Sequence, residues 1–256
     1  HQEVYQKREL GENVLELNGL SGHGFSNVNL TVKKGSIVGL TGLQGSGSSE
    51  LLQGLFGAVT VTGGTLKVSG KECRIHSIQE AMKAGIAMLA SNRKENSVIP
   101  DMSILENMYL SEQVLSARQP LISAGRERER YEKYKKLLSI KAADPKDPIT
   151  SLSGGNQQKV FLARWLNTEA GILLLDNPTQ GIDVGAKAEI YKLILKLADA
   201  GKTILINTLE IPELAKVADC CAVFYEGTII KMLQHEEIDE KTVMLYSTNA
   251  AQKGES

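Results

Sequence analysis

The chain has 256 residues, enough to bury the core of one large domain, with or without a subdomain. Hydrophobic residues make up 42% of it, charged residues 23%, and the formal net charge is -1. A net charge of -1 gives no electrostatic reason to expect a nucleic-acid partner, because duplex binding normally needs a basic face. No apolar run approaches the roughly 18 residues needed to span a bilayer.

The first third of the chain indicates short strands around a glycine-rich loop. Residues 1–12 are polar and without periodicity, and we expect a frayed leader or linker there. Alternating and continuous apolar runs predict the elements that follow. In chain order these are strands at 14–17, 28–32 and 36–40, a helix at about 49–56, a strand at 63–68, a helix at 78–83 and a strand at 86–89.

The middle of the chain changes character. Residues 126–138 are strongly charged with apolar residues at helical spacing, which is typical of a solvated helix. Pro145 and Pro148 then interrupt the chain before the last third, where strands and helices alternate. The predicted elements there are a strand at 172–175, a helix at 187–197, a strand at 203–206, a helix at 212–218 and a strand at 222–225. This alternation predicts an α/β domain with a mostly parallel sheet.

The glycine-rich loop follows a buried strand and precedes a helix, which is the setting of a phosphate-binding P-loop. The lysine position of that motif holds Ser48, while the next residue, Ser49, can still offer a hydroxyl to Mg²⁺. Losing the lysine removes a charge-assisted hydrogen bond and weakens nucleotide binding by roughly tenfold to a hundredfold. The candidate phosphate-binding residues are Gly42, Gln44, Gly45, Ser46, Gly47, Ser48 and Ser49.

A second glycine turn, Leu152 to Lys159 (LSGGNQQK), opens directly into an amphipathic helix with Ser153 at the expected N-cap. Such a helix start offers unpaired N–H groups and a positive dipole end, which suit a phosphate. The string resembles the LSGGQ signature of ATP-binding cassette (ABC) ATPases, in the form found in importers for ribose, galactose and xylose. Over nearly its whole length the chain is similar to the second, C-terminal ATP-binding half of such importer subunits.

The resemblance implies a P-loop NTPase (RecA-like) core with a mostly parallel sheet, an N-terminal antiparallel β subdomain and an inserted α-helical subdomain. It places the ATP-binding domain at residues 13–246, the helical subdomain at about 95–155 and a polar tail at 247–256. Residues 101–108 resemble the segment that docks onto the membrane subunit, although their apolar side chains could equally belong to the helical subdomain's core.

The resemblance assigns roles to several residues, and at some of these positions this chain departs from the family's pattern. The apolar strand that ends in Asp176 resembles the Walker B run, and Asp176 would organise Mg²⁺ together with Ser49. Asn177 stands where the family has its catalytic glutamate; an amide can bond a water but cannot take its proton. Leu209 stands at the position of the switch histidine, and residues 91–94 also depart from the family's Mg²⁺-facing position.

ABC domains act in head-to-tail pairs, so the resemblance implies that this chain's signature turn contacts a partner domain's ATP. Ser153, Gly154 and Gly155 would donate to that γ-phosphate, and Asp183 would help set the geometry across the interface. The chain's own site, which would bind ATP or ADP with Mg²⁺ weakly, would be slow or inert. The alternatives are an autonomous ABC ATPase, a non-catalytic regulatory domain, and a non-transport ABC protein acting on ribosomes or DNA.

The partners implied are a second ABC ATP-binding domain in the same polypeptide, transmembrane permease subunits and, indirectly, a periplasmic or extracellular solute-binding protein. The polar leader further suggests a piece cut from a longer protein. Three cysteines without framework spacing indicate free thiols and a reducing compartment. The expected location is therefore cytoplasmic, peripheral on the inner face of the cell membrane.

Overall fold

The computed structural model describes residues 5–90, 132, 146–148, 151–166 and 170–253. The chain divides into two compact units. The first unit comprises residues 1–88, 171–177 and 194–256, and the second comprises residues 89–170 and 178–193. The predictions made for residues 91–94 and 101–108, and almost all of those for 126–138 and the helical subdomain, lie outside the described residues.

An antiparallel four-stranded sheet forms in the first unit, as predicted. Its strands, in the order β2-β1-β4-β5, are β2 (Phe25–Lys33), β1 (Asn13–Gly22), β4 (Val61–Val68) and β5 (Lys71–Cys73). In β2, Val28, Leu30 and Val32 are buried while Asn29 and Thr31 between them are exposed. This alternation is typical of a sheet with one face on the core and the other in water.

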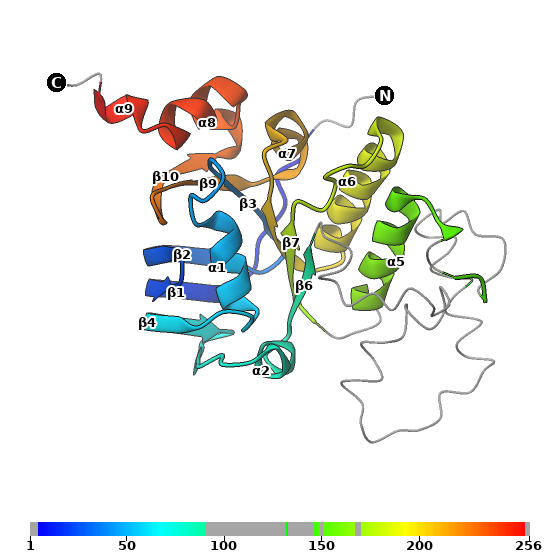
Figure 1. Ribbon diagram of the computed structural model, residues 1–256, viewed down its shortest axis with the longest axis horizontal. Coiled ribbons are helices and arrows are strands. Elements are labelled where there is room, and N and C mark those ends of the chain that lie inside the picture. The colour runs from blue at the N-terminus through cyan, green and yellow to red at the C-terminus, as the bar shows by residue number, and fades with distance from the viewer. Residues whose placement is uncertain (1–4, 91–131, 133–145, 149–150, 167–169, 254–256) are drawn as a thin grey trace. The chain divides into compact units, whose positions relative to one another are not determined.

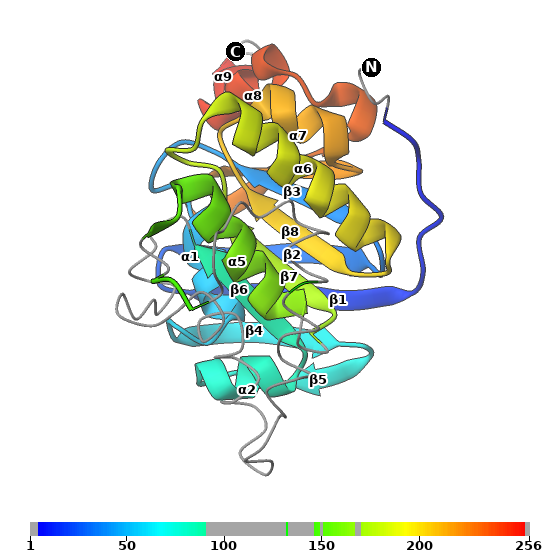
Figure 2. The same cartoon turned by 90° about the vertical axis from the view of Figure 1, so that its right-hand side faces the viewer.

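A six-stranded sheet carries the predicted parallel strands. Its order is β10 (Thr228–Gln234), β9 (Cys220–Tyr225), β3 (Ile37–Thr41), β8 (Thr203–Asn207), β7 (Ile172–Asp176) and β6 (Ile86–Ala90). β3 pairs in parallel with β9 and, on its other side, with β8. β7 in turn pairs in parallel with β8 (Figure 2). Every residue of β3, β7 and β8 is buried, which explains their continuous apolar sequences.

The register of these parallel strands decides where polar groups gather. Leu40 of β3 and Asp176 of β7 are both paired with Asn207 of β8. The carboxyl ends of three neighbouring strands therefore meet at one edge of the sheet. The loop that follows β3 and the residues that follow β7 and β8 leave the sheet from this edge.

Helix α1 (Ser48–Leu55) shares one hydrophobic core with both sheets (Figure 1). Leu51, Leu52 and Leu55 on its buried side belong to the same cluster as Leu17 of β1 and Leu174 of β7. The remaining helices of the first unit are α2 (Ile78–Lys83), α7 (Ile211–Val217), the 3₁₀ helix η2 (His235–Glu237), α8 (Glu240–Ser247) and α9 (Ala250–Lys253).

In the second unit the described helices are α5 (Gly154–Leu166) and the first part of α6 (Val184–Asp199), which continues into the first unit. Both begin close to where the sequence predicts a helix start. Among the described residues, no helix is both long enough and apolar enough to cross a membrane.

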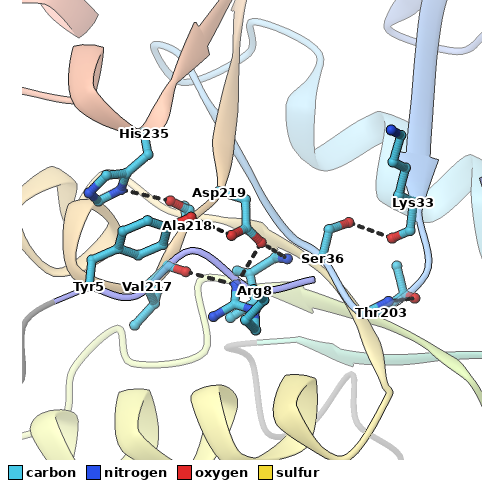
Figure 3. Close-up of polar contacts among 11 residues, drawn as sticks. Tyr5, Arg8, Lys33, Ser36, Thr203, Val217, Ala218, Asp219 and His235 are labelled. Atoms are coloured by element: carbon cyan, nitrogen blue, oxygen red, sulfur yellow. Dashed lines mark hydrogen bonds and ion pairs between the residues drawn. The ribbon is translucent and has the colours of Figure 1, made fainter. Parts of the chain in front are cut away.

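That residues 1–12 form a leader or linker stays a prediction, and the structure describes residues 5–12 of this segment. This segment has no regular secondary structure, but Asp219, just before β9, binds it (Figure 3). The Asp219 carboxylate accepts from Tyr5 Oη at 2.6 Å, from Arg8 Nη2 at 2.6 Å and from the backbone N–H of Ile37 at 2.8 Å. Tyr5 also stacks on His235, with ring centroids 3.5 Å apart. Burial, and then the bond to Asp219, raise the pKa of Tyr5, so it remains a donor at neutral pH.

The vicinal cysteines are structural. Cys221 is fully buried in β9, and burial raises the pKa of its thiol to about 12. Burial also raises the pKa of Cys220 to about 11. Both side chains therefore stay protonated and unreactive at neutral pH.

Replacing the shared acceptor should release the N-terminal segment. We expect Asp219→Ala to lower the free energy of unfolding by about 3 kcal/mol, because it leaves the Arg8 charge and two further donors unpaired. Tyr5→Phe, which removes a single hydrogen bond, should cost about 1 kcal/mol. Urea unfolding of the full chain measures both values, and equal losses in the two variants would contradict the shared-acceptor arrangement.

Candidate functional site

The loop between β3 and α1 can be built only with glycine at two positions. Gly42 and Gly47 have φ angles of 155° and 108°. A Cβ on Gly47 would lie 2.7 Å from the carbonyl oxygen of Gly24, and one on Gly42 would lie 2.7 Å from that of Phe224. Both approaches are shorter than a carbon–oxygen contact allows, so these glycines fix the course of the loop.

This loop presents main-chain donors rather than charge. Gly47 caps α1 without a side-chain hydrogen bond, so the first N–H groups of the helix have no side-chain acceptor from the cap. Backbone bonds from Ser46 N to Leu43 O (3.0 Å) and from Gly227 N to Ser46 O (2.8 Å) hold the turn. Residues 42–49 contain no charged side chain, and Ser48 at the lysine position is 6% exposed. From this loop, a phosphate would meet N–H groups, the helix dipole and neutral polar side chains, but no charged side chain.

Beside the loop, the structure pairs the predicted metal-binding residues. Ser49 Oγ donates to Asp176 Oδ2 at 2.6 Å, joining the first turn of α1 to the end of β7. A hydroxyl and a carboxylate in contact are the oxygen donors that Mg²⁺ prefers. The residues present therefore fit a magnesium ion on a bound nucleotide: Ser49 would ligate it, and Asp176 would hold it directly or through water.

Asn177, which the sequence predicts to stand at the catalytic-glutamate position, has a left-handed backbone with φ 47°, a conformation that asparagine tolerates better than most residues. Its backbone N–H donates to the carbonyl of Asn207 at 2.8 Å, and its side-chain amide lies 3.4 Å from Asp176 Oδ1. An amide cannot accept a proton from water. Leu209, which is predicted to stand at the switch position, is 65% exposed and its side chain carries no polar atom. The Asn177 side chain therefore offers no proton acceptor, and the Leu209 side chain offers no polar contact.

The glycine turn of the second unit forms the predicted helix cap. Ser153 Oγ accepts from the N–H of Asn156 at 3.3 Å, and the Ser153 carbonyl accepts from Gln157 N at 2.9 Å. The Ser153 side chain is exposed. Asp183 likewise caps α6, since its Oδ1 accepts from Ala186 N at 3.0 Å, and it is exposed too.

Close helix packing brings these two caps near one another within the second unit. A Cβ on Gly155 would lie 2.7 Å from Cβ of Ala186 and 3.6 Å from Cγ2 of Ile182, next to Asp183. One turn further along, the buried Lys159 forms an ion pair with Glu189 of α6. Gly155 thus has a packing role of its own, because only a residue without a side chain lets α5 approach α6 this closely.

The structure gathers most of the predicted site residues into two groups, one in each unit. The first unit holds the glycine loop with Ser49, Asp176 and Asn177, and the second holds Ser153 to Gly155 with Asp183. Sequence reasoning missed Asn207, whose amide Nδ2 donates to Asp176 Oδ1 at 2.7 Å. Its position at the carboxyl end of a buried strand was the available signal.

A glycine loop between a buried parallel strand and a helix, with a serine–aspartate pair from the adjoining strand end, defines a P-loop nucleotide-binding fold. Residues 25–180 match the family model described as ABC transporter. The chain therefore belongs to the ABC transporter family.

Relatives of known type cover nearly all of the chain. The arabinose import ATP-binding protein AraG of Vibrio parahaemolyticus is 40% identical over 94% of this chain and 48% of that protein. The ribose import ATP-binding protein RbsA of Geobacillus kaustophilus is 39% identical over 96% of this chain and 50% of that protein. The chain spans about half the length of the curated relatives it matches.

Solved structures bear out the fold class. A nucleotide-free ATP-binding cassette from an ABC transporter superposes with a TM-score of 0.78 over 92% of this chain and 99% of that chain, at 22% identity. The cassette MJ0796, solved as a dimer bound to ADP and Pi, gives a TM-score of 0.74 at 23% identity, over 86% of this chain and 98% of that chain. At these identities the likeness concerns the fold alone.

Gly155→Val tests the helix packing behind the signature turn. We expect a loss of about 1–3 kcal/mol in the free energy of unfolding, because the added side chain overlaps Ala186. Gly185→Ala is the matched control: this glycine lies in the exposed first turn of α6, so alanine should be neutral or stabilise by up to about 1 kcal/mol. Urea denaturation compares the two, and a stable Gly155→Val protein would refute the close approach of the helices.

Proposed function

We propose that this chain is the nucleotide-binding domain of an ABC importer for a monosaccharide-type solute, with a degenerate ATP site of its own. Its signature turn, Ser153 to Gly155, would serve an ATP held by a partner domain. The hydroxyl of Ser153 and the N–H groups at the start of α5 would donate to that γ-phosphate, and Asp183 would help to align the two domains.

The observation that carries the proposal is the contrast between the two groups of site residues. The Ser153 turn is exposed, capped and followed by a helix anchored on α6, so it is complete as a phosphate-facing surface. The chain's own loop lacks a charged side chain, Asn177 rather than an acid follows Asp176, and the apolar Leu209 stands where the resemblance places the switch histidine. Main-chain phosphate donors are present in both groups, whereas the lysine, the glutamate and the histidine that the resemblance places at the chain's own loop are absent.

The nucleotide at the chain's own loop would be ATP or ADP with Mg²⁺, bound weakly. Main-chain donors and the Ser49–Asp176 pair support binding, and the absent lysine limits its strength. Asp176 is acceptor to Ser49, Asn207 and, at 3.4 Å, Asn177, which are all neutral donors. The Asn177 amide next to Asp176 would not act as a base toward a water near the γ-phosphate.

The printed names of the relatives, which are arabinose and ribose import proteins, support the solute class. The chain spans about half of each, which supports a second ATP-binding half in the same polypeptide. The proposed ATP-binding domain is residues 13–246, between a linker and a polar tail. Its partners would be transmembrane permease subunits and, through them, a solute-binding protein outside the membrane. The chain would act on the cytoplasmic face of that membrane.

Substitution of Ser153 in the complete two-domain ATPase subunit, assembled with its permease, tests the proposal. We expect Ser153→Arg to lower ATP turnover by about a hundredfold, since it removes a donor and blocks the phosphate. Ser77→Arg is the matched control, because Ser77 caps α2 through the same kind of hydrogen bond, to Glu80 N, and should leave turnover unchanged.

Asn177→Ala separates the alternatives in the same assay. The proposal predicts turnover within about twofold of the original. Loss of turnover in Asn177→Ala with normal turnover in Ser153→Arg would instead indicate an autonomous ATPase site in this chain. Normal turnover in both variants would indicate a regulatory domain.

Restoring the lysine should strengthen nucleotide binding at the chain's own loop. We expect Ser48→Lys to lower the Kd for ADP with Mg²⁺ by roughly tenfold to a hundredfold, through a charge-assisted hydrogen bond. Ser48→Met adds a side chain of similar length without charge and should bring no such gain. Isothermal titration calorimetry measures both, and equal affinities would mean that the loop does not bind phosphate as proposed.

A further inference from the structure

Besides Ser49, two side-chain amides lie near the Asp176 carboxylate. Its Oδ1 accepts from Asn207 Nδ2 at 2.7 Å, and the amide of Asn177 lies farther away at 3.4 Å. We propose that Asn207 is a positioning residue, which orients the Asp176 carboxylate for the Mg²⁺ of a nucleotide at this chain's own loop. The inference rests on the nucleotide site proposed above and is independent of the role of the Ser153 turn.

The sheet fixes the geometry of this contact. Asp176 and Asn207 are paired residues at the carboxyl ends of β7 and β8, and the backbone bond from Asn177 N to Asn207 O, 2.8 Å long, continues that pairing. Asp176 is 8% exposed and Asn207 is 7% exposed. Because a carboxylate only accepts hydrogen bonds, the amide nitrogen of Asn207 is the atom that faces it.

The charge of Asp176 depends on neutral donors such as the Asn207 amide. Among the residues that the structure describes, Asp176 has no ion-pair partner, and the loop at 42–49 has no charged side chain. The negative charge is therefore compensated by hydrogen bonds alone. If the Asn207 amide were removed, Oδ1 would keep only the 3.4 Å contact to Asn177, and the carboxylate could rotate away from Ser49.

That rotation would weaken the Mg²⁺-dependent part of nucleotide binding and leave the binding of phosphate by main-chain N–H groups unchanged. Mg²⁺ supplies a positive charge that bridges phosphate oxygens to protein oxygens, and its protein side here is Ser49 with Asp176. Partners that orient a metal-binding group typically change metal affinity by about tenfold to a hundredfold when they are replaced. The main-chain donors of the glycine loop do not involve Asn207, so binding of metal-free nucleotide should not depend on it.

The experiment compares ADP binding with Mg²⁺ and with EDTA, by calorimetry on the full chain. We expect Asn207→Leu, which keeps the branching of the side chain at Cγ but removes the amide, to reduce the Mg²⁺-dependent gain in affinity about tenfold and to leave the EDTA value unchanged. Thr203→Val is the matched control: Thr203 is buried in the same strand at its other end, where its hydroxyl accepts from Gly35 N. This control should keep the full response to Mg²⁺.

Asn207→Ser, whose hydroxyl is one bond shorter than the amide, is a milder variant that should show the same loss if Asn207→Leu does not fold. Equal losses with Mg²⁺ and with EDTA would show that Asn207 is only structural and would overturn the inference. An unchanged Mg²⁺ response would overturn it as well. If the original chain's ADP affinity did not respond to Mg²⁺, this inference would fail while the proposal for Ser153 would stand, because that proposal concerns the partner's ATP.

Discussion

The hydrogen bond from Ser49 to Asp176 links the glycine loop to the end of a different strand, and it exists because β3, β8 and β7 run parallel in adjacent positions. Parallel strands bring their carboxyl ends to one edge, so residues about 130 positions apart meet there through sheet register alone. The apolar sequences of these strands bury the sheet on both faces. The polar edge of the sheet thus results from how the buried strands pair. Substitutions of side chains at that edge need not alter the fold.

That independence would allow this domain to keep a phosphate-binding fold with the degenerate ATP site that we propose. The glycine loop and the start of α1 depend on backbone conformation, which Gly42 and Gly47 secure. Under the proposal, Ser48, Asn177 and Leu209 stand where the family has a lysine, a glutamate and a histidine, and these side chains would decide the chemistry of the loop. In the second unit the residues next to the glycine turn also contribute to the fold. Gly155 and the Lys159–Glu189 ion pair lie in the contact between α5 and α6, and this contact supports the exposed Ser153 turn at the start of α5.

Local signals in the sequence were sufficient for the buried strands, the glycine loop and the Ser153 cap, because each depends on residues within one or two turns. They were insufficient for β5, β10 and α8, where short, mixed segments are ordered by neighbouring strands rather than by their own periodicity. The anchoring of Tyr5 and Arg8 by Asp219 joins residues more than 200 positions apart, so no local pattern predicts it. Asn207 was missed for the same reason: its role depends on pairing with β7.

The central claim is that the chain's two phosphate-binding groups act on two different nucleotides. The glycine loop at 42–49 would hold the chain's own nucleotide, the Ser153 turn would contact the ATP of a partner domain, and only the partner's ATP would be hydrolysed. The most direct test is ATP hydrolysis by the chain alone, at saturating ATP and Mg²⁺, with phosphate release followed over many hours. The account predicts no release above that of the Asp176→Ala variant. Sustained turnover that Asp176→Ala or Asn177→Ala abolishes would show that the chain's own site is a working ATPase and would contradict the account.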